Sequence, residues 1–186
     1  MHEPITALVS GWETFYVIIG SSAAALTGLM FVVIALTGEA RRGGLKATVA
    51  SIRAFGTPII VHFGAVLLLA ALLTTPAHTV ITLSLSLAAC GVGGLGFVRW
   101  VAIQTRRQQE YQPVDEDYEW HITLPAIVYG AVLLGAAGLW WRPIPALTLV
   151  GAAALFLLYI GIRNAWDSAI YIAVGPPPAP PSSPKR

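Results

Sequence analysis

The sequence predicts an all-α membrane protein, a bundle of five transmembrane helices. Three observations favour this fold class. Hydrophobic residues make up 56% of the 186-residue chain, and charged residues only 11%, whereas a soluble domain carries about 25% charged residues. The stretch 14–38 contains no charge and exceeds the ~20 apolar residues that cross a bilayer as a helix. Four further apolar stretches follow it along the chain.

The five predicted helices occupy residues 14–38, 56–75, 79–103, 122–141 and 146–174. Together they form one transmembrane domain over residues 1–174, because the polar remainder is too scattered to build a soluble domain. Residues 1–12 are expected to be a short tail before the first helix. Residues 175–186 are Pro-rich and are expected to be a disordered tail, since proline cannot continue a helix.

Proline and glycine positions define the predicted connections. Apolar residues recur at helical spacing over 45–55 and predict a short amphipathic helix before the second span. Gly56–Pro58 are expected to interrupt it, so that the second span begins there, with proline in its first turn. Residues 75–78 and 142–145 predict two tight turns.

The distribution of basic residues predicts the orientation. If the N-terminus is outside, ten of the eleven Lys and Arg residues lie at cytoplasmic helix ends, connections or tail, and only Arg142 lies outside. All six Trp residues lie near predicted helix ends, where an indole ring suits the headgroup region. The sequence therefore predicts the N-terminus outside, the C-terminus inside and an odd number of spans.

Small residues recur along one face of the first helix. Gly20, Ala24 and Gly28 stand four positions apart, and Ser21 and Thr27 widen this face. Small side chains let helix backbones approach closely, which drives helix association inside a bilayer. The face is therefore interpreted as a packing surface, either within one monomer or between subunits and along a pore.

The first helix also carries the pattern F-x-x-x-x-G-x-x-x-A-A-x-T-G-L-x-F-V, which begins at Phe15. This pattern resembles the opening of a group of small, uncharacterised bacterial polytopic integral-membrane proteins. The resemblance covers one helix of the five. It implies a location in the bacterial inner membrane and implies no activity.

Few polar side chains lie within the predicted spans. Those that are candidates for a binding site or pathway share one level, toward the cytoplasm: Glu39, His62, Arg99, Arg163 and Asp167. A charge deep in a bilayer costs about 2.5–3.5 kcal/mol on insertion scales, so such a group faces a partner or a wet cavity. Arg163 and Asp167 are four residues apart on one helical face and are expected to pair.

Two interpretations of this polar level stay open. In one it is a vestibule, where Arg99 and Arg163 attract an anion or lipid phosphate and His62 titrates near neutral pH. In the other the arginines reach the headgroups, and Asp167 pairs with Arg163. His62 is too short to reach the headgroups. It is expected to be buried, either bonded to a carbonyl or hydroxyl group or acting as a proton relay.

Other motifs predict no site. Gly91, Gly93 and Gly96 match G-x-G-x-x-G but lie in an apolar span without a strand, so close helix packing or a flexible point is expected instead. The acidic residues of 110–119 lack the glycine and closing glutamate of a calcium loop. No second histidine is expected to face His62, and the one cysteine has no metal-ligand spacing, so no metal or cofactor is predicted.

The sequence favours a homo-oligomeric channel or transporter subunit for a small ion or solute. A five-span chain without an internal repeat makes a pathway between subunits the expected arrangement. The alternative is a structural or accessory subunit of a larger membrane complex, with the first helix and the Pro-rich tail as docking surfaces.

No enzyme activity is expected, because Ser21 and Ser22 lie in the other half of the membrane from His62. The expected partners are the lipid bilayer, further copies of the chain and another membrane protein. Nucleic acid is excluded because the net charge is only +2.

Overall fold

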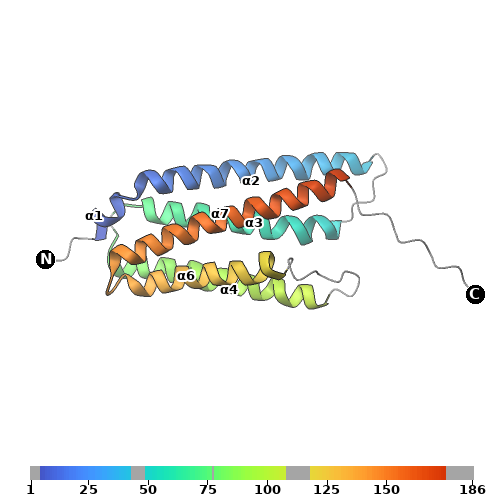
Figure 1. Ribbon diagram of the computed structural model, residues 1–186. Coiled ribbons are helices and arrows are strands. Elements are labelled where there is room, and N and C mark those ends of the chain that lie inside the picture. Colours follow the sequence, from blue (N-terminus) through green and yellow to red (C-terminus); the bar gives the residue numbers. More distant parts are fainter. Residues whose placement is uncertain (1–4, 43–48, 77, 108–117, 175–186) are drawn as a thin grey trace, which may run out of the picture.

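Five long helices run side by side along one axis in a computed structural model of the chain (Figure 1). They are α2 (Glu13–Arg42), α3 (Val49–Thr74), α4 (Val80–Arg107), α6 (Leu124–Gly138) and α7 (Pro143–Val174). Two short elements accompany them, α1 (Ile5–Ser10) and the π-helical turn η1 (Glu119–Thr123). The structure describes residues 5–42, 49–76, 78–107 and 118–174, with the side chains of 5–36, 57–76, 78–105 and 118–170.

Every described element is helical, and five stretches are long and apolar enough to cross a membrane. These stretches are Glu13–Leu36, Thr57–Thr74, Val80–Thr105, Glu119–Gly138 and Pro143–Ile170. In hydrocarbon each backbone N–H and C=O must be satisfied within its own segment, which a helix achieves. The prediction of an all-α protein is confirmed, and so is the prediction of five helices long and apolar enough to span a membrane.

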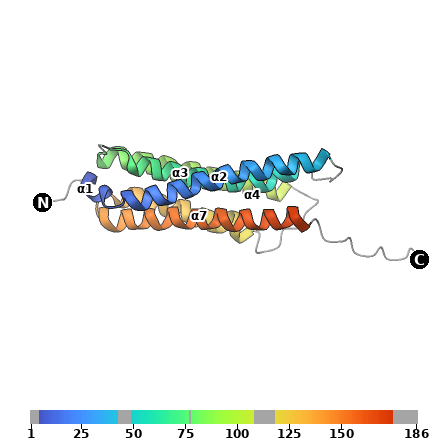
Figure 2. The same cartoon turned by 90° about the horizontal axis from the view of Figure 1, so that it is seen from above.

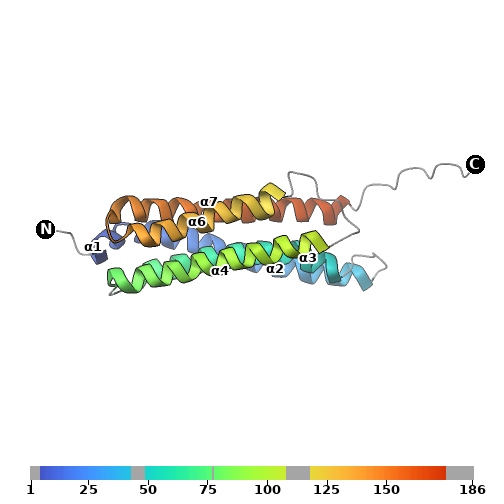
Figure 3. The same ribbon diagram turned by 90° about the horizontal axis from the view of Figure 1, so that it is seen from below.

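Helix α7 joins the two pairs of closely packed helices, α2 with α3 and α4 with α6. It packs against α6 and α3, and it is the most buried of the five spans. Helix α2 packs chiefly on α3, and α4 chiefly on α6, so α3, α7, α6 and α4 form a ring with α2 beside it. Contact between α3 and α4 is less extensive. Figure 2 shows α2 next to α3 and α7 from above, and Figure 3 shows α4 and α6 on the other side.

The two ends of the bundle carry exposed indole rings. One end holds α1 and the turns after α3 and α6, and we call it the α1 end; α2, α4 and α7 terminate at the opposite end (Figure 1). Trp140 and Trp141 are exposed at the α1 end, and Trp100 and Trp166 are exposed toward the opposite end. Two levels of exposed tryptophan match the two headgroup regions of a bilayer.

Residues 5–10 form a helix, so the prediction of a tail over residues 1–12 is wrong here. Ile5 and Val9 are buried, and α1 contacts α7 and α3. Trp12, which follows α1, packs against α7, since a Cβ at Gly151 would come within 2.8 Å of its indole ring. The sequence did contain a signal for this helix, because Ile5 and Val9 are four residues apart.

Two predicted connections are corrected by the positions of prolines. Helix α3 continues through Pro58, so the predicted interruption at Gly56–Pro58 is wrong. A proline removes one intrahelical hydrogen bond, and membrane helices tolerate this where other groups satisfy the freed carbonyl. Pro143 is the first residue of α7, so the turn predicted over residues 142–145 ends at Arg142. Proline fits this position because the N–H groups of a first helical turn have no intrahelical partners.

Three predicted features lie outside the described residues. They are the Pro-rich tail of 175–186, the acidic loop through Asp117 and the side chains of the amphipathic segment 45–55. The division of the chain into one domain and a disordered tail therefore stays a prediction.

Candidate functional site

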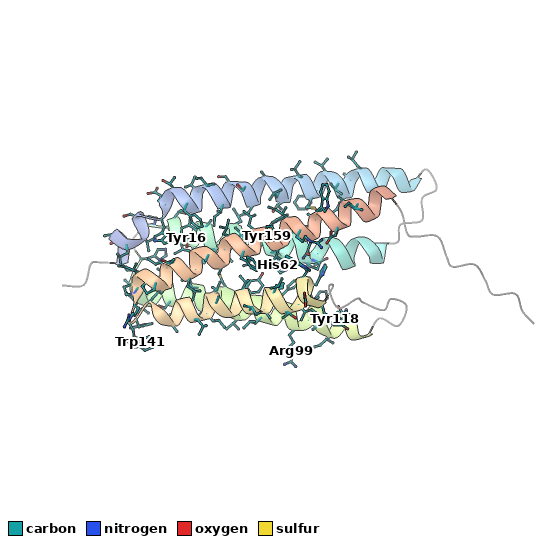
Figure 4. The ribbon with its side chains drawn as sticks, in the orientation of Figure 1. Tyr16, His62, Arg99, Tyr118, Trp141 and Tyr159 are labelled. Carbon is teal, nitrogen blue, oxygen red and sulfur yellow. The ribbon has the colours of Figure 1, made fainter. Side chains whose placement is uncertain are left out.

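A histidine lies buried where three helices meet. His62 of α3 is only 1% exposed, and Figure 4 shows it inside the bundle. Its Nδ1 atom lies 3.1 Å from the hydroxyl oxygen of Tyr129 in α6, within hydrogen-bonding distance. The ring of Phe97 in α4 stands edge-on to the imidazole, with 6.2 Å between ring centroids. The expectation that His62 is buried and bonded to a hydroxyl group agrees with this geometry.

Glycines of α4 allow Tyr129 to reach this position. A Cβ at Gly94 would lie 2.1 Å from a ring carbon of Tyr129, and a Cβ at Gly91 would lie 2.6 Å from Leu133. The missing side chains let α6 approach α4 closely enough for the tyrosine ring to lie across Gly94. The small residues of α4 therefore set the place from which the Tyr129 hydroxyl meets His62.

The predicted packing role of the α4 glycines is only partly correct. Gly91 does face α6, as expected. Gly93 and Gly96 are exposed, and a Cβ added at either would meet no atom within 4 Å, so the prediction is wrong for these two. Gly94 was missed, although it makes the closest approach of the four. An i, i+3 spacing from Gly91 to Gly94 places these two on one helical face.

A second buried polar side chain lies at nearly the same depth. Gly161 of α7 lies against the Phe63 ring of α3, where a Cβ would be 2.5 Å from a ring carbon. Helices α3 and α7 are antiparallel. His62, one residue before Phe63, and Asn164, three residues after Gly161, therefore both lie nearer than this contact to the end of the bundle opposite the α1 end. At 1.5 Å of rise per residue their depths differ by about 3 Å. Asn164 is 1% exposed. We call His62, Phe97, Tyr129 and Asn164 the polar core.

The polar core contains hydrogen-bonding atoms without partners. Among the described residues, His62 Nε2 and both amide atoms of Asn164 are buried and unpartnered. Leaving a buried donor or acceptor unsatisfied costs about 1–3 kcal/mol. Tyr16 and Ser84 also bury an unpartnered hydroxyl, nearer the α1 end. Three of these unpartnered atoms belong to His62 and Asn164, at similar depths in the bundle, and each is free to bond to a hydrogen-bonding ligand.

The turn η1, which leads into α6, carries a second histidine, His121. π-Helical turns are rare and frequently occur at functional sites. The part of the chain that the structure describes contains no group of three or more His, Cys, Asp or Glu side chains able to hold a metal ion.

Arg163 and Asp167 form the predicted ion pair along α7. The Arg163 guanidinium carbon also lies 5.3 Å from the centroid of the Trp120 ring in η1, a cation–π distance. The pair is partly solvent-accessible, with side chains 28% and 47% exposed. This geometry agrees with the interpretation in which Arg163 reaches the headgroup level beside its carboxylate partner.

Arg99 does not join this group. It is exposed on α4, beside the buried Val98, and Figure 4 shows its side chain pointing away from the bundle. A vestibule in which Arg99 and Arg163 act together is therefore not assembled within one chain. Glu39 lies in α2, but its side chain is outside the described residues.

The small-residue face of α2 divides into two parts. Gly20 is buried against α3, where a Cβ would lie 2.8 Å from the Cβ of Ala70. Ser21, Ala24 and Gly28 are exposed, and Gly28 has no atom within 4 Å of its Cβ position. Thr27 is half-buried, with its hydroxyl donating to the carbonyl of Ala23. Most of this face is therefore unused by the chain's own packing.

Sequence reasoning missed Tyr129 and Phe97 as neighbours of His62. A signal existed for Tyr129: α3 and α6 run in the same direction, and each residue lies six or seven positions into its predicted span. No comparable signal existed for Phe97, because an aromatic residue in an apolar helix usually packs in a core or faces lipid.

Comparison with protein-family models, curated proteins and solved structures gives no match for this chain. The resemblance of the first helix to bacterial membrane proteins therefore stays a prediction.

Proposed function

We propose that this chain is a membrane transport protein that carries a small ion or solute through its polar core. The observation that supports this proposal is a pair of buried side chains, His62 and Asn164, with unpartnered atoms inside a bundle of apolar helices. Polar groups at membrane depth are expensive, and they commonly mark a substrate or ion pathway. His62 lies within the helix ring of one chain, which favours a pathway through the monomer over the intersubunit pathway expected from the sequence.

Flux measurements test this function. Liposomes containing only the purified protein should pass a small ion or solute faster than empty liposomes. We expect His62→Phe to reduce this flux, since it removes both imidazole nitrogens and keeps a flat ring. Gln104→Leu removes an exposed amide on α4 and should leave the flux unchanged. A folded, correctly inserted wild-type protein without any flux would rule out transport.

The proposal includes self-association and a defined orientation. The exposed small residues of α2, Ser21, Ala24 and Gly28, support a contact between copies of the chain. The distribution of Lys and Arg supports the N-terminus outside and the C-terminus inside a bacterial inner membrane. Labelling of Arg142→Cys by an impermeant reagent from outside intact cells tests this orientation, and labelling only after lysis would reverse it.

No catalysed reaction is part of the proposal. Ser21 is exposed on α2, outside the ring that contains His62, and the Ser22 hydroxyl donates to the carbonyl of Ile18. A serine nucleophile needs a base within hydrogen-bonding reach, which neither arrangement favours.

A second candidate function is an accessory subunit of a larger membrane complex. The exposed face of α2 favours it, because α2 lies at the edge of the bundle and packs chiefly on one neighbour. Deletion of residues 175–186 or replacement of Gly28 by Ile should then remove a co-purifying membrane protein. Purification of the chain as a stable single species with flux of its own would contradict this second function.

A further inference from the structure

The polar core has no charged side chain to match an ion. Each carboxylate whose side chain the structure describes is exposed: Glu13, Glu119 and Asp167. Of the described arginine side chains, Arg99 and Arg142 are exposed, and Arg163 is paired with Asp167. A buried cation or anion requires a counter-charge or several strong dipoles to replace its hydration, and its transfer is otherwise costly. The charge distribution therefore favours an uncharged occupant.

The unpartnered atoms of the polar core offer both kinds of hydrogen bond. The amide of Asn164 provides N–H donors and a carbonyl acceptor, and both atoms are unpartnered. The neutral imidazole of His62 has one donor and one acceptor nitrogen, and Nδ1 already faces the Tyr129 hydroxyl. Nε2 is left as a donor if the hydroxyl donates to Nδ1, and as an acceptor in the other tautomer. A ligand that both donates and accepts is complementary to either state.

We propose that the polar core binds and passes a small neutral molecule that donates and accepts hydrogen bonds, such as water, a short polyol or urea, and does not pass ions. This inference rests on the proposed transport function and names its substrate class. Buried water makes about three hydrogen bonds to otherwise unsatisfied groups. His62 and Asn164 leave three such atoms unpartnered at buried positions.

The role of each side chain follows from its position. Asn164 supplies the donor and acceptor that contact the solute. Tyr129 lies within hydrogen-bonding distance of Nδ1 of His62 and so orients the imidazole, which leaves Nε2 free for the solute. Phe97 stands edge-on to the imidazole and presents an apolar wall beside it. Tyr129 is accordingly a positioning residue, and Asn164 is a binding residue.

Stopped-flow light scattering on proteoliposomes tests this inference, with water, glycerol and urea as neutral probes and K⁺ and Cl⁻ as ionic probes. We expect the wild-type protein to raise the permeability of at least one neutral probe severalfold over empty liposomes and to leave ion flux unchanged. Asn164→Leu should reduce the neutral flux about tenfold, equivalent to about 1.4 kcal/mol of barrier height.

Two further variants separate a site effect from misfolding. Tyr129→Phe keeps the ring against Gly94 and removes only the hydroxyl, so it should fold normally and still reduce the neutral flux. Tyr159→Phe makes the same chemical change on the exposed face of α7 and should leave the flux unchanged. The fold of each variant is checked by its elution in detergent and its helical content.

The outcomes distinguish the inference from the function on which it rests. Flux of K⁺ or Cl⁻ without neutral flux would overturn the inference and keep the transport function. Neutral flux that is unaffected by both Asn164→Leu and Tyr129→Phe would overturn the role of the polar core. An absence of flux for all five probes in folded wild-type protein would overturn both proposals.

Discussion

Gly94 of α4 and Gly28 of α2 lie in similar apolar helices but have opposite surroundings. A Cβ at Gly94 would lie 2.1 Å from the Tyr129 ring, whereas a Cβ at Gly28 would meet no atom within 4 Å. Gly161 of α7 repeats the first case against Phe63. Gly94 and Gly161 therefore face neighbouring helices, whereas Ser21, Ala24 and Gly28 of α2 are exposed on the outside of the chain.

Glycine thus serves two purposes in membrane helices. Where a bulky ring lies across the glycine, the missing side chain allows a contact within the chain and fixes the position of the ring. Where no ring is present, the glycine leaves a flat place on the outer surface that lipid or another helix can cover. Substitutions at the two kinds of glycine should consequently affect different properties, stability in one case and assembly in the other.

Gly94→Ala is expected to have the largest effect. Its Cβ would overlap the Tyr129 ring, so α4 and α6 must separate, and we expect a loss of about 3 kcal/mol in the free energy of unfolding. Unfolding by SDS in mixed micelles measures this change. Gly93→Ala, at the adjacent exposed position, should cost less than about 0.5 kcal/mol or stabilise the helix slightly. Equal stability of the two alanine variants would show that the contact with Tyr129 is dispensable.

Gly20→Ala is expected to have an intermediate effect. The new Cβ would come within 2.8 Å of the Cβ of Ala70, and neither group can rotate away. Helix α2 lies at the edge of the bundle and can shift outward, so we expect a loss of about 1–2 kcal/mol. Gly28→Ala in the same helix is the matched control and should keep or slightly raise stability, by up to about 1 kcal/mol. Equal free energies of unfolding for Gly20→Ala and Gly28→Ala would contradict the close contact between Gly20 and Ala70.

Gly28→Ile should have the smallest effect on stability, below about 0.5 kcal/mol, because its side chain enters open surroundings. If the α2 face joins copies of the chain, the same substitution lowers the mass of the detergent-solubilised particle to one chain. Light scattering coupled to size-exclusion chromatography measures this mass. Gly64→Ile, at another exposed glycine, should leave it unchanged. A wild-type protein that is already monomeric would contradict self-association.

The number and type of helices could be predicted from the sequence because the bilayer limits both. Hydrocarbon thickness sets the length of an apolar run, and unsatisfied backbone groups exclude other folds. Helix ends were harder to predict. Pro58 lies within α3, and Pro143 begins α7, although proline alone is equally compatible with a turn.

The inward face of each helix could not be predicted from composition. Lipid and the bundle interior are both apolar, so Gly93 and Gly94 have the same surroundings as far as polarity is concerned. Which of them meets Tyr129 depends on the rotation of α4 relative to α6, and that is fixed by packing. The same limit explains why Arg99 points away from the bundle, whereas Arg163 pairs with Asp167 and lies beside Trp120.

The candidate site was predictable in depth but not in partners. His62 was expected to be buried, because its side chain is too short to reach the headgroups, and it is. The hydrogen bond to Tyr129 and the nearby Asn164 depend on the packing of α6 and α7, which no local pattern reports. Contacts between residues far apart in the sequence are set by helix packing and cannot be read from one helix at a time.

The position of α7 between the two helix pairs also has a consequence for biosynthesis. A ribosome delivers α2 and α3, then α4 and α6, before α7 emerges, and each of these pairs is in extensive contact in the folded protein. Contact between α3 and α4 is limited, so the α2–α3 hairpin and the α4–α6 hairpin stay separate in the membrane until α7 packs against α3 and α6. Asn164 arrives with that last helix. The bundle and its polar core are therefore completed in one late step, and a chain that stops before α7 would hold two separate hairpins for the membrane's quality-control proteases to recognise.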